Sequence, residues 1–454
     1  MSDPTGRPDS ATADDATPDP GPEPHPLTLR ENFRILLGAS RAFWLVNVVN
    51  FGDGIAYFGI LNLLTLFIHG DVGFPDHLTG IAVSTFTGLV TLCMFGGGFV
   101  SDRLGVRRAL TLSVAGLLVG RLLLVLSPLP GGAAGSATLW AGLAAMGLAS
   151  GVLQPALYAG VKEFTDPRTA TIGYSLLYAI MNLGIVAETF VSPFIREASG
   201  IAGVFWAMIG VTGLMLAANL LFFTRRVEER DRVVAYAVAP HADRRTLGAK
   251  LRALPFLDAR FLFFIFILLP VRTLFAHQFL TLPDYVVRCF PENVGARYEW
   301  FQGLNPLIIV IFVPLFAALT RKVNIITMMI LGTAVSALTT FILVPGPNLA
   351  TLILYVVFFS LGEAMWSSRF LEYVADLAPA GQVGAYMGLA GIPWFLAKFT
   401  TGWYSGAMIA RFLPEGGPQD SGTLWLIYAL FACLSPLGLI LGRRWVQRGV
   451  KTPH

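Results

Sequence analysis

Long apolar runs alternate with short polar turns along almost the whole chain. Beginning at Phe43, each run holds about 20 or more residues, enough for a helix to cross the roughly 30 Å hydrocarbon core of a bilayer. The pattern therefore predicts an all-α membrane protein with twelve transmembrane helices in two six-helix bundles. The expected spans are 43–68, 79–101, 107–127, 137–162, 168–196, 201–224, 259–283, 298–320, 323–344, 349–371, 383–410 and 422–443.

The longest polar interruption, 225–258, separates the sixth span from the seventh. It divides an N-terminal bundle at 41–224 from a C-terminal bundle at 259–443. Six helices plus six across a linker is how two-bundle transporters are built, with the substrate site where the halves meet near the midplane. Residues 1–40 are a tail and pre-helix segment, expected to be disordered at its Pro- and Asp-rich start, and 444–454 form a second tail.

Basic residues concentrate in the loops on the same side as this linker. The opposite loops hold few of them, chiefly Arg196, Arg288, Arg297 and Arg411. Because cytoplasmic loops carry the excess of Lys and Arg, we expect the linker and both termini to be cytoplasmic, in the cell (inner) membrane. The basic residues on this side outside the linker are Arg30, Arg34, Arg41, Arg103, Arg107, Arg108, Lys162, Arg168, Arg321, Lys322, Arg443, Arg444 and Arg448.

Composition supports the membrane assignment and excludes several functions. The chain is 55% hydrophobic and 13% charged, so it is far more apolar than a soluble protein whose surface contacts water. Its net charge of +4 is dispersed among loops, so nucleic-acid binding is not expected. Cys93, Cys289 and Cys433 have no metal-binding spacing and are expected to be free thiols. No nucleotide-binding loop or hydrolase motif is present, so we expect no cofactor, no metal and no enzyme, and a monomer in the lipid bilayer.

A charged turn between the second and third spans carries a specific motif. The pattern G-x-x-x-D-R-x-G-x-R-R cannot lie in hydrocarbon, so it predicts a cytoplasmic hairpin. It resembles the loop between the second and third helices of the major facilitator superfamily. The resemblance implies that the acid meets the neighbouring bundle in one closed state while the arginines hold the cytoplasmic side; the alternative is an ordinary basic loop whose glycines let helices approach. The motif residues are Gly98, Asp102, Arg103, Gly105, Arg107 and Arg108.

The first helix carries a polar stripe within its apolar run. Asn47, Asn50, Asp53 and Tyr57 recur at spacings of three, three and four, which places them on one face. We expect Asn50 and Tyr57 to bind substrate and Asp53 to couple protons, because an ionisable residue in mid-membrane is a functional hypothesis by default. The alternative is a hydrogen-bonded seam between helices with Asp53 neutral.

The fifth helix repeats this theme. Tyr178 and Asn182 lie four residues apart and are predicted to bind substrate, and Glu188 projects close to the same face. We expect Glu188 to take part in proton coupling. The alternative is a buried structural ion pair between Glu188 and Arg121.

The C-terminal half has its own set of polar residues. Trp394 and Lys398 share a face of the eleventh helix, Glu363 and Trp366 share one on the tenth, and Arg272 lies near the middle of the seventh. One carboxylate between two cations suits an anionic or zwitterionic ligand, or a proton carrier that changes partner. We therefore expect Glu363 to take part in proton coupling as well as substrate binding. The substrate-binding residues expected in this half are Arg272, Glu363, Trp366, Trp394 and Lys398. The alternative is a permanent bridge from Glu363 to Lys398 or to Arg272.

Several segments resemble the proton-coupled oligopeptide transporter family. Gly173–Gly184 is similar to its fifth-helix signature G-F-S-x-F-Y-x-x-I-N-x-G, Gln302–Leu307 to its eighth helix, and Gly362-Glu363 to its tenth. The resemblance implies that Glu363 meets a substrate amine and that Asp53 is a proton site.

The first-helix pattern of that family, E-x-x-E-R-F-x-Y-Y-G, departs here. Residues 50–59 keep one acid and the tyrosine but hold an amide for the first acid and lack the arginine. Where the family has Lys-Pro in the fourth helix, this chain has Gln154-Pro155. The acidic residue that the family has in the seventh helix would fall here near Ala276 and His277. The two cations that the family directs at the peptide carboxylate and the coupling proton are therefore absent.

These observations predict a secondary active transporter that works by alternating access. We expect it to move a small organic solute, peptide-like or amine-bearing, with protons as the coupling ion. The alternative within transport is a proton-driven exporter of drugs or metabolites. The alternative of another class is a membrane receptor that does not transport.

Overall fold

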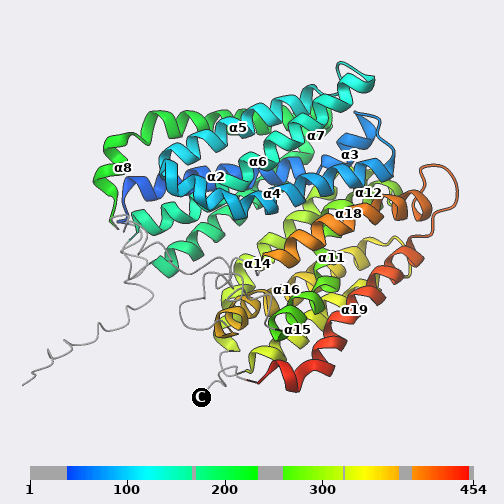
Figure 1. The fold of residues 1–454 in the computed structure, drawn as a ribbon. Coiled ribbons are helices and arrows are strands. Elements are labelled where there is room, and N and C mark those ends of the chain that lie inside the picture. The colour runs from blue at the N-terminus through cyan, green and yellow to red at the C-terminus, as the bar shows by residue number, and fades with distance from the viewer. Residues whose placement is uncertain (1–37, 166–169, 234–258, 321–322, 378–390, 449–454) are drawn as a thin grey trace, which may run out of the picture.

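A computed structural model describes residues 38–165, 170–233, 259–320, 323–377 and 391–448. In these ranges the chain is almost entirely helical, and the helices form two groups (Figure 1). The first half of the sequence, blue to green, lies above the second half, yellow-green to red, in that view.

The first group contains the helices before the undescribed part of the linker, including a final short helix within the linker itself. They are α2 (Arg41–Leu61), α3 (Leu64–Gly70), α4 (Asp76–Leu104), α5 (Val106–Leu126), α6 (Gly132–Phe164), α7 (Ala170–Phe222) and α8 (Arg225–Asp231). In α7 the chain leaves helical geometry at Gly200, whose φ of 70° favours glycine, so this element comprises the predicted fifth and sixth spans.

The second group begins after the undescribed part of the linker. Its elements are α10 (Ala259–Ile267), α11 (Leu269–Leu280), α12 (Leu282–Cys289), α13 (Glu292–Gly295), α14 (Tyr298–Leu319), α15 (Ile325–Thr339), η3 (Thr340–Leu343), α16 (Leu349–Leu377), α18 (Ile392–Phe412) and α19 (Ser421–Val446). Pro270 and Pro283 lie at the starts of α11 and α12, where the missing N–H of proline interrupts the hydrogen-bond ladder, so the seventh span is a broken helix.

The prediction of an all-α membrane fold is confirmed. Nine helical stretches in the described ranges are long and apolar enough to cross a membrane, and one of them, Leu176–Phe222, has 47 residues and therefore room for two crossings. Described helix covers part of each of the twelve predicted spans. The predicted linker is described only to residue 233, and the N-terminal tail up to 37 and residues 449–454 lie outside the described ranges.

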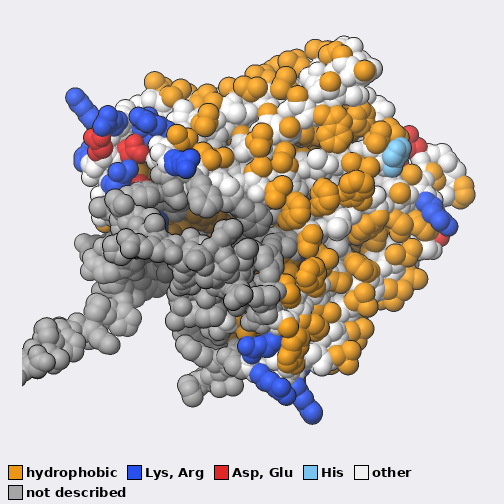
Figure 2. Space-filling model, viewed as in Figure 1, with side chains coloured by type: hydrophobic (Ala, Val, Ile, Leu, Met, Phe, Trp, Pro, Cys, Tyr) orange, Lys and Arg blue, Asp and Glu red, His pale blue; other side chains and the backbone are white. Residues whose placement is uncertain are grey.

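The exterior is apolar around the middle and charged at the ends. Large side chains such as Leu112, Leu148, Leu214 and Leu441 are exposed on the outward faces of their helices. Figure 2 shows apolar side chains across the face between the ends, with charged groups gathered beside α8 at the left and a few at the right. We name these the α8 end and, opposite it, the α12 end, where α3 and α12 lie (Figure 1).

The two halves meet along pairs of closely packed helices. At the α4–α18 contact, a Cβ built on Gly80 would lie only 2.6 Å from the carbonyl oxygen of Gly402. At the α7–α14 contact, a Cβ built on Gly303 would lie 3.0 Å from Thr189 Cβ. Glycine allows these backbones to approach, as small residues do between membrane helices generally. The cavity described next lies between the halves.

Candidate functional site: a cavity between the two halves

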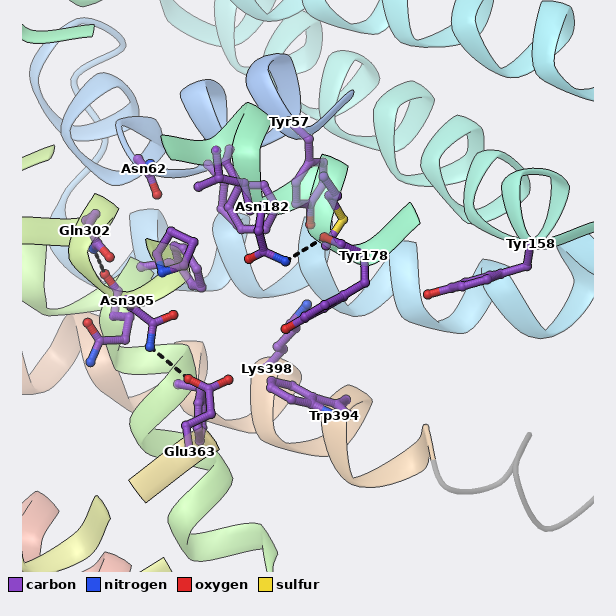
Figure 3. A pocket seen from close by; sticks show the side chains of 18 residues that line it. Tyr57, Asn62, Tyr158, Tyr178, Asn182, Gln302, Asn305, Glu363, Trp394 and Lys398 are labelled. Atoms are coloured by element: carbon purple, nitrogen blue, oxygen red, sulfur yellow. Dashed lines mark hydrogen bonds between the residues drawn. The ribbon is translucent and has the colours of Figure 1, made fainter. Parts of the chain in front are cut away.

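A cavity of about 410 Å³ lies where the two halves face each other (Figure 3). Its wall combines seven aromatic side chains, five amides, four other apolar residues and two charged groups. They are Tyr57, Phe58, Tyr158, Tyr178, Phe275, Phe279 and Trp394; Asn62, Asn182, Gln278, Gln302 and Asn305; Leu61, Met181, Ile185 and Pro306; and Glu363 and Lys398. A mostly apolar pocket with a few convergent polar groups is typical of a small-molecule site.

The structure brings most of the predicted binding residues together. The ones that line the cavity are Tyr57, Tyr178, Asn182, Glu363, Trp394 and Lys398. Asn50, Trp366 and Arg272 lie outside its wall. Asn50 Nδ2 instead donates a hydrogen bond to the carbonyl oxygen of Leu177, 2.6 Å away, which ties α2 to α7.

Glu363 of α16 faces the cavity with an amide as its partner. Asn305 Nδ2, from α14, donates to Glu363 Oε2 at 2.8 Å and also contacts Ser360 Oγ at 2.9 Å. Figure 3 shows Asn305 and Glu363 directed at each other across the lower wall. Among the residues that the structure describes, Glu363 forms no ion pair, so neither alternative bridge, to Lys398 or to Arg272, is present.

Lys398 of α18 enters the same cavity beside Trp394 (Figure 3). Its Nζ lies 5.8 Å from the centre of the Trp394 ring. No carboxylate within the described ranges lies within ion-pair distance of this ammonium group. Its backbone carbonyl oxygen accepts a hydrogen bond from Ser84 Oγ of the other half.

Arg272 is buried behind the cavity wall inside an aromatic cage. Its guanidinium carbon lies 5.1, 4.3 and 4.7 Å from the ring centres of Trp366, Phe370 and Trp394. Its side chain is 1% exposed, and Nε and Nη1 have no hydrogen-bond partner in the described part of the chain. Trp394 contacts Arg272 and lines the cavity as well, so one ring joins the two environments.

Two buried charged residues of the first half, Asp53 and Arg121, pair with each other instead. Arg121 Nη2 lies 3.4 Å from Asp53 Oδ1, and Gln154 Nε2 donates to Asp53 Oδ2 at 3.2 Å. Arg121 Nη1 also contacts Thr212 Oγ1. This polar group is buried between α2, α5, α6 and α7 and does not line the cavity. The alternative pairing of Arg121 with Glu188 is wrong, because Arg121 is turned toward α2.

Glu188 is buried near the cavity without a cation. It is 2% exposed, and Asn62 Nδ2 donates to its Oε2 at 3.3 Å. Because Asn62 lines the cavity and contacts Glu188, only one side chain lies between Glu188 and the cavity. Within the described ranges Glu188 has no ion-pair partner.

Several wall residues escaped the sequence analysis. Asn62, Gln278 and Gln302 are buried amides within apolar helices, and Tyr158 faces the cavity from α6. Amides in apolar runs are the signal that would have found the first three, since a buried amide needs a partner. Tyr158 carries no such signal, because a tyrosine in a membrane helix also fits an ordinary packing position.

The charged turn between α4 and α5 contacts α8. Gly105, with a φ of 77°, forms the turn, and Arg107 Nε lies 3.1 Å from Glu228 Oε2. Gly98 lies within α4, and Arg103 and Arg108 are exposed. The side chain of Asp102 lies outside the described residues, so its predicted contact with the other half stays a prediction.

At the α12 end, ion pairs join the two halves. Arg288 of α12 binds Asp76 of α4 through two hydrogen bonds of 2.6 and 3.0 Å, and Arg196 of α7 binds Glu299 of α14 at 2.7 Å. Arg288 also lies 2.8 Å from Asp284. Burial raises the pKa of Asp284 to about 6, against the opposing effect of Arg288. These contacts clamp the halves together at this end.

The chain belongs to the Major Facilitator Superfamily, whose family model matches residues 46–402. It is therefore a multi-pass membrane transporter of a small molecule and not an enzyme.

Curated relatives are similar over most of the chain. Dipeptide and tripeptide permease A of Erwinia pyrifoliae is 22% identical over 417 residues, covering 78% of this chain and 82% of the relative. An uncharacterized MFS-type transporter of Bacillus subtilis, YqjV, is 21% identical over 392 residues, covering 83% and 86%.

Solved structures share the fold at low identity. A peptide transporter POT in complex with sulfate has a TM-score of 0.70 and 19% identity, covering 92% of this chain and 99% of its own. A POT family transporter in complex with 5-aminolevulinic acid has a TM-score of 0.70 and 15% identity, covering 90% and 97%.

Proposed function

We propose that this major facilitator protein is a proton-coupled secondary transporter of a small, amine-bearing or peptide-like solute. The observation that carries the proposal is the position of Glu363. It faces a cavity between two halves with an amide partner and no cation among the described residues, so it is available to a ligand amine or a proton. The similarity to dipeptide and tripeptide permeases supports an amine-bearing solute.

The proposed orientation of the protein in the membrane follows from the positions of the basic loops. With the α8 end in the cytoplasm and both termini there, the Arg288–Asp76 and Arg196–Glu299 pairs lie on the outer side of the cell membrane. They then hold the outer side closed, and the solute exchanges through the α8 end. Breaking these pairs is part of the proposed step that opens the cavity outward.

Three buried acids are candidates for the proton. Glu363 lines the cavity, and Asp53 is paired with Arg121. Glu188 accepts a hydrogen bond from Asn62, which lines the cavity. Protonation of Asp53 would release Arg121 from its carboxylate partner and so loosen the ion pair that joins α2 to α5. We propose that Glu363 senses the solute and that Asp53 and Glu188 carry the coupling.

The test is uptake into proteoliposomes under an imposed pH gradient. Purified full-length protein is reconstituted with a pH-sensitive dye inside, and amines, amino acids and dipeptides are added outside at acidic pH. We expect lumenal acidification with an accepted solute, and we expect Glu363→Gln to abolish it. Glu197→Gln, which removes an exposed acid at the α12 end, is the matched control and should behave as wild type.

A proton-driven exporter is the second candidate, favoured by the seven aromatic side chains that line the cavity. An exporter would move hydrophobic amines against the proton gradient, so the sign of the proton flux relative to solute flux separates the two. Solute binding without any flux in either direction would instead identify a receptor and overturn both transport proposals.

A further inference from the structure

The two charged groups of the cavity wall both come from the second half. Glu363 lies on α16 and Lys398 on α18. The first half contributes hydroxyl, amide and apolar groups, including Tyr57, Tyr178 and Asn182. A ligand in this cavity therefore meets ionic contacts on one side and neutral contacts on the other.

Lys398 is half-buried, lines the cavity and has no carboxylate among the described residues to offset its charge. A charged group removed from water is costly unless it is paired, and its partner has to come from the surroundings or from a ligand. The described residues supply the face of Trp394 at 5.8 Å and no acid within ion-pair distance. The ammonium group is thus open to an anion that enters the cavity.

Arg272 does not compete for that anion. Three aromatic faces at 4.3–5.1 Å surround its guanidinium group, and cation–π contacts stabilise a cation that is removed from water. Trp394 lines the cavity, whereas Arg272 does not. The charges left for a ligand are therefore one carboxylate and one ammonium group.

We propose that Lys398 is the carboxylate site of this cavity, so that the ligand is a compact zwitterion. Its carboxylate binds Lys398, its amine binds Glu363 as in the function proposed above, and its aromatic or apolar body lies against the tyrosines of the first half. The proposal rests on the transport function proposed above and names its substrate class. Figure 3 shows Glu363 and Lys398 entering the cavity from different helices, with Trp394 beside Lys398. The two groups form no ion pair with each other, so a ligand that carries both charges can bridge them.

The cavity size agrees with a small ligand. At about 410 Å³ it lies toward the lower end of the volumes found for small-molecule pockets, which run from about 300 to 1,000 Å³. Five amides around the charged pair offer donors and acceptors for further polar atoms of the ligand. A long peptide or a bulky drug would exceed this space.

The experiment is a cycle of protein and ligand changes, read as thermal stabilisation of detergent-purified, full-length protein. The probes are L-phenylalanine and L-alanyl-L-phenylalanine, each with its carboxyl amide and its desamino analogue. We expect wild type to bind at least one free zwitterion about 10- to 100-fold more tightly than its amide, as for a hydrogen bond to a charged group. Lys398→Gln should lose this discrimination, and Glu363→Gln should lose the discrimination against the desamino analogue.

Two further variants make the outcome decisive. Lys398→Arg keeps the charge and should keep the preference for the free carboxylate, and Lys162→Gln, which removes an exposed lysine of α6, should change nothing. If Lys398→Gln folds and still prefers the carboxylate, or if wild type binds the amides as tightly as the zwitterions, the proposal is overturned.

The test also separates this inference from the proposed transport function. Proton flux driven by cationic or neutral amines, with no response to any zwitterion, would leave the transport function standing and overturn the zwitterion site. Zwitterion binding that depends on Lys398, without flux, would leave the zwitterion site standing and overturn the transport function.

Discussion

Each half holds a pair of charged residues, and the two pairs differ in their partners. In the first half, Asp53 and Arg121 pair with each other and with Gln154, away from the cavity. In the second half, Glu363 and Lys398 face the cavity without an ion pair. The comparison indicates that the Asp53–Arg121 pair holds helices of the first half together, whereas Glu363 and Lys398 are left for a ligand.

The largest effect is expected from breaking the pair in the first half. Arg121→Met leaves Asp53 buried without its cation, and removal of one member of a buried pair costs about 3–5 kcal/mol. We expect a large fall in melting temperature and in the yield of monodisperse protein in detergent.

The double variant Asp53→Asn/Arg121→Met should recover most of that stability, because no uncompensated charge remains. A double variant as unstable as Arg121→Met alone would show that the loss comes from packing and not from the unpaired carboxylate.

A pH dependence is expected from the α12 end. The pKa of Asp284 is raised in the folded protein to about 6, so the folded state favours the protonated form. This contribution to stability is fully present below the ordinary pKa of about 4 and is lost as the pH rises through 6, at about 1.4 kcal/mol per pH unit. Asp284→Asn should flatten the dependence of melting temperature on pH between 4 and 6, and an unchanged slope would place its origin elsewhere.

Glu363→Gln should have a much smaller effect on stability than Arg121→Met. The amide can still accept the hydrogen bond from Asn305, and no cation is left unpaired, so we expect less than about 1 kcal/mol. Substrate-induced stabilisation should nevertheless disappear. A melting temperature that falls as far as in Arg121→Met would remove the difference between the halves.

The smallest effect is expected in the charged turn. Arg107→Gln removes a partly exposed pair with Glu228, which is worth about 0.2–1 kcal/mol. Transport rate should fall more than stability if this contact guides α4 and α8 during opening. Glu228→Gln is the matched variant, and initial rates of uptake compared with melting temperatures check the expectation.

The fold was predictable because run length alone identifies membrane spans. The partner of Arg121 was harder to predict. The sequence does not show whether Arg121 pairs with Asp53 or with Glu188, and only the spatial arrangement of α2, α5 and α7 decides between them. The rotation of a helix was also hard to fix. Trp366 follows Glu363 by three residues, so its side chain points about 60° away from that of Glu363 around the helix axis. That difference places Trp366 against Arg272 instead of in the cavity. Asn62 was missed because its role depends on Glu188 from another helix.

The glycine-rich contact between α4 and α18 has a mechanical consequence. Ser84 of α4 donates to the carbonyl oxygen of Lys398, on the same residue whose ammonium group enters the cavity. If α4 slides along α18, this hydrogen bond has to lengthen or exchange partners, and the backbone at Lys398 is displaced with it. The position of one half is thereby transmitted to the cavity through a single peptide group, without any intermediate loop.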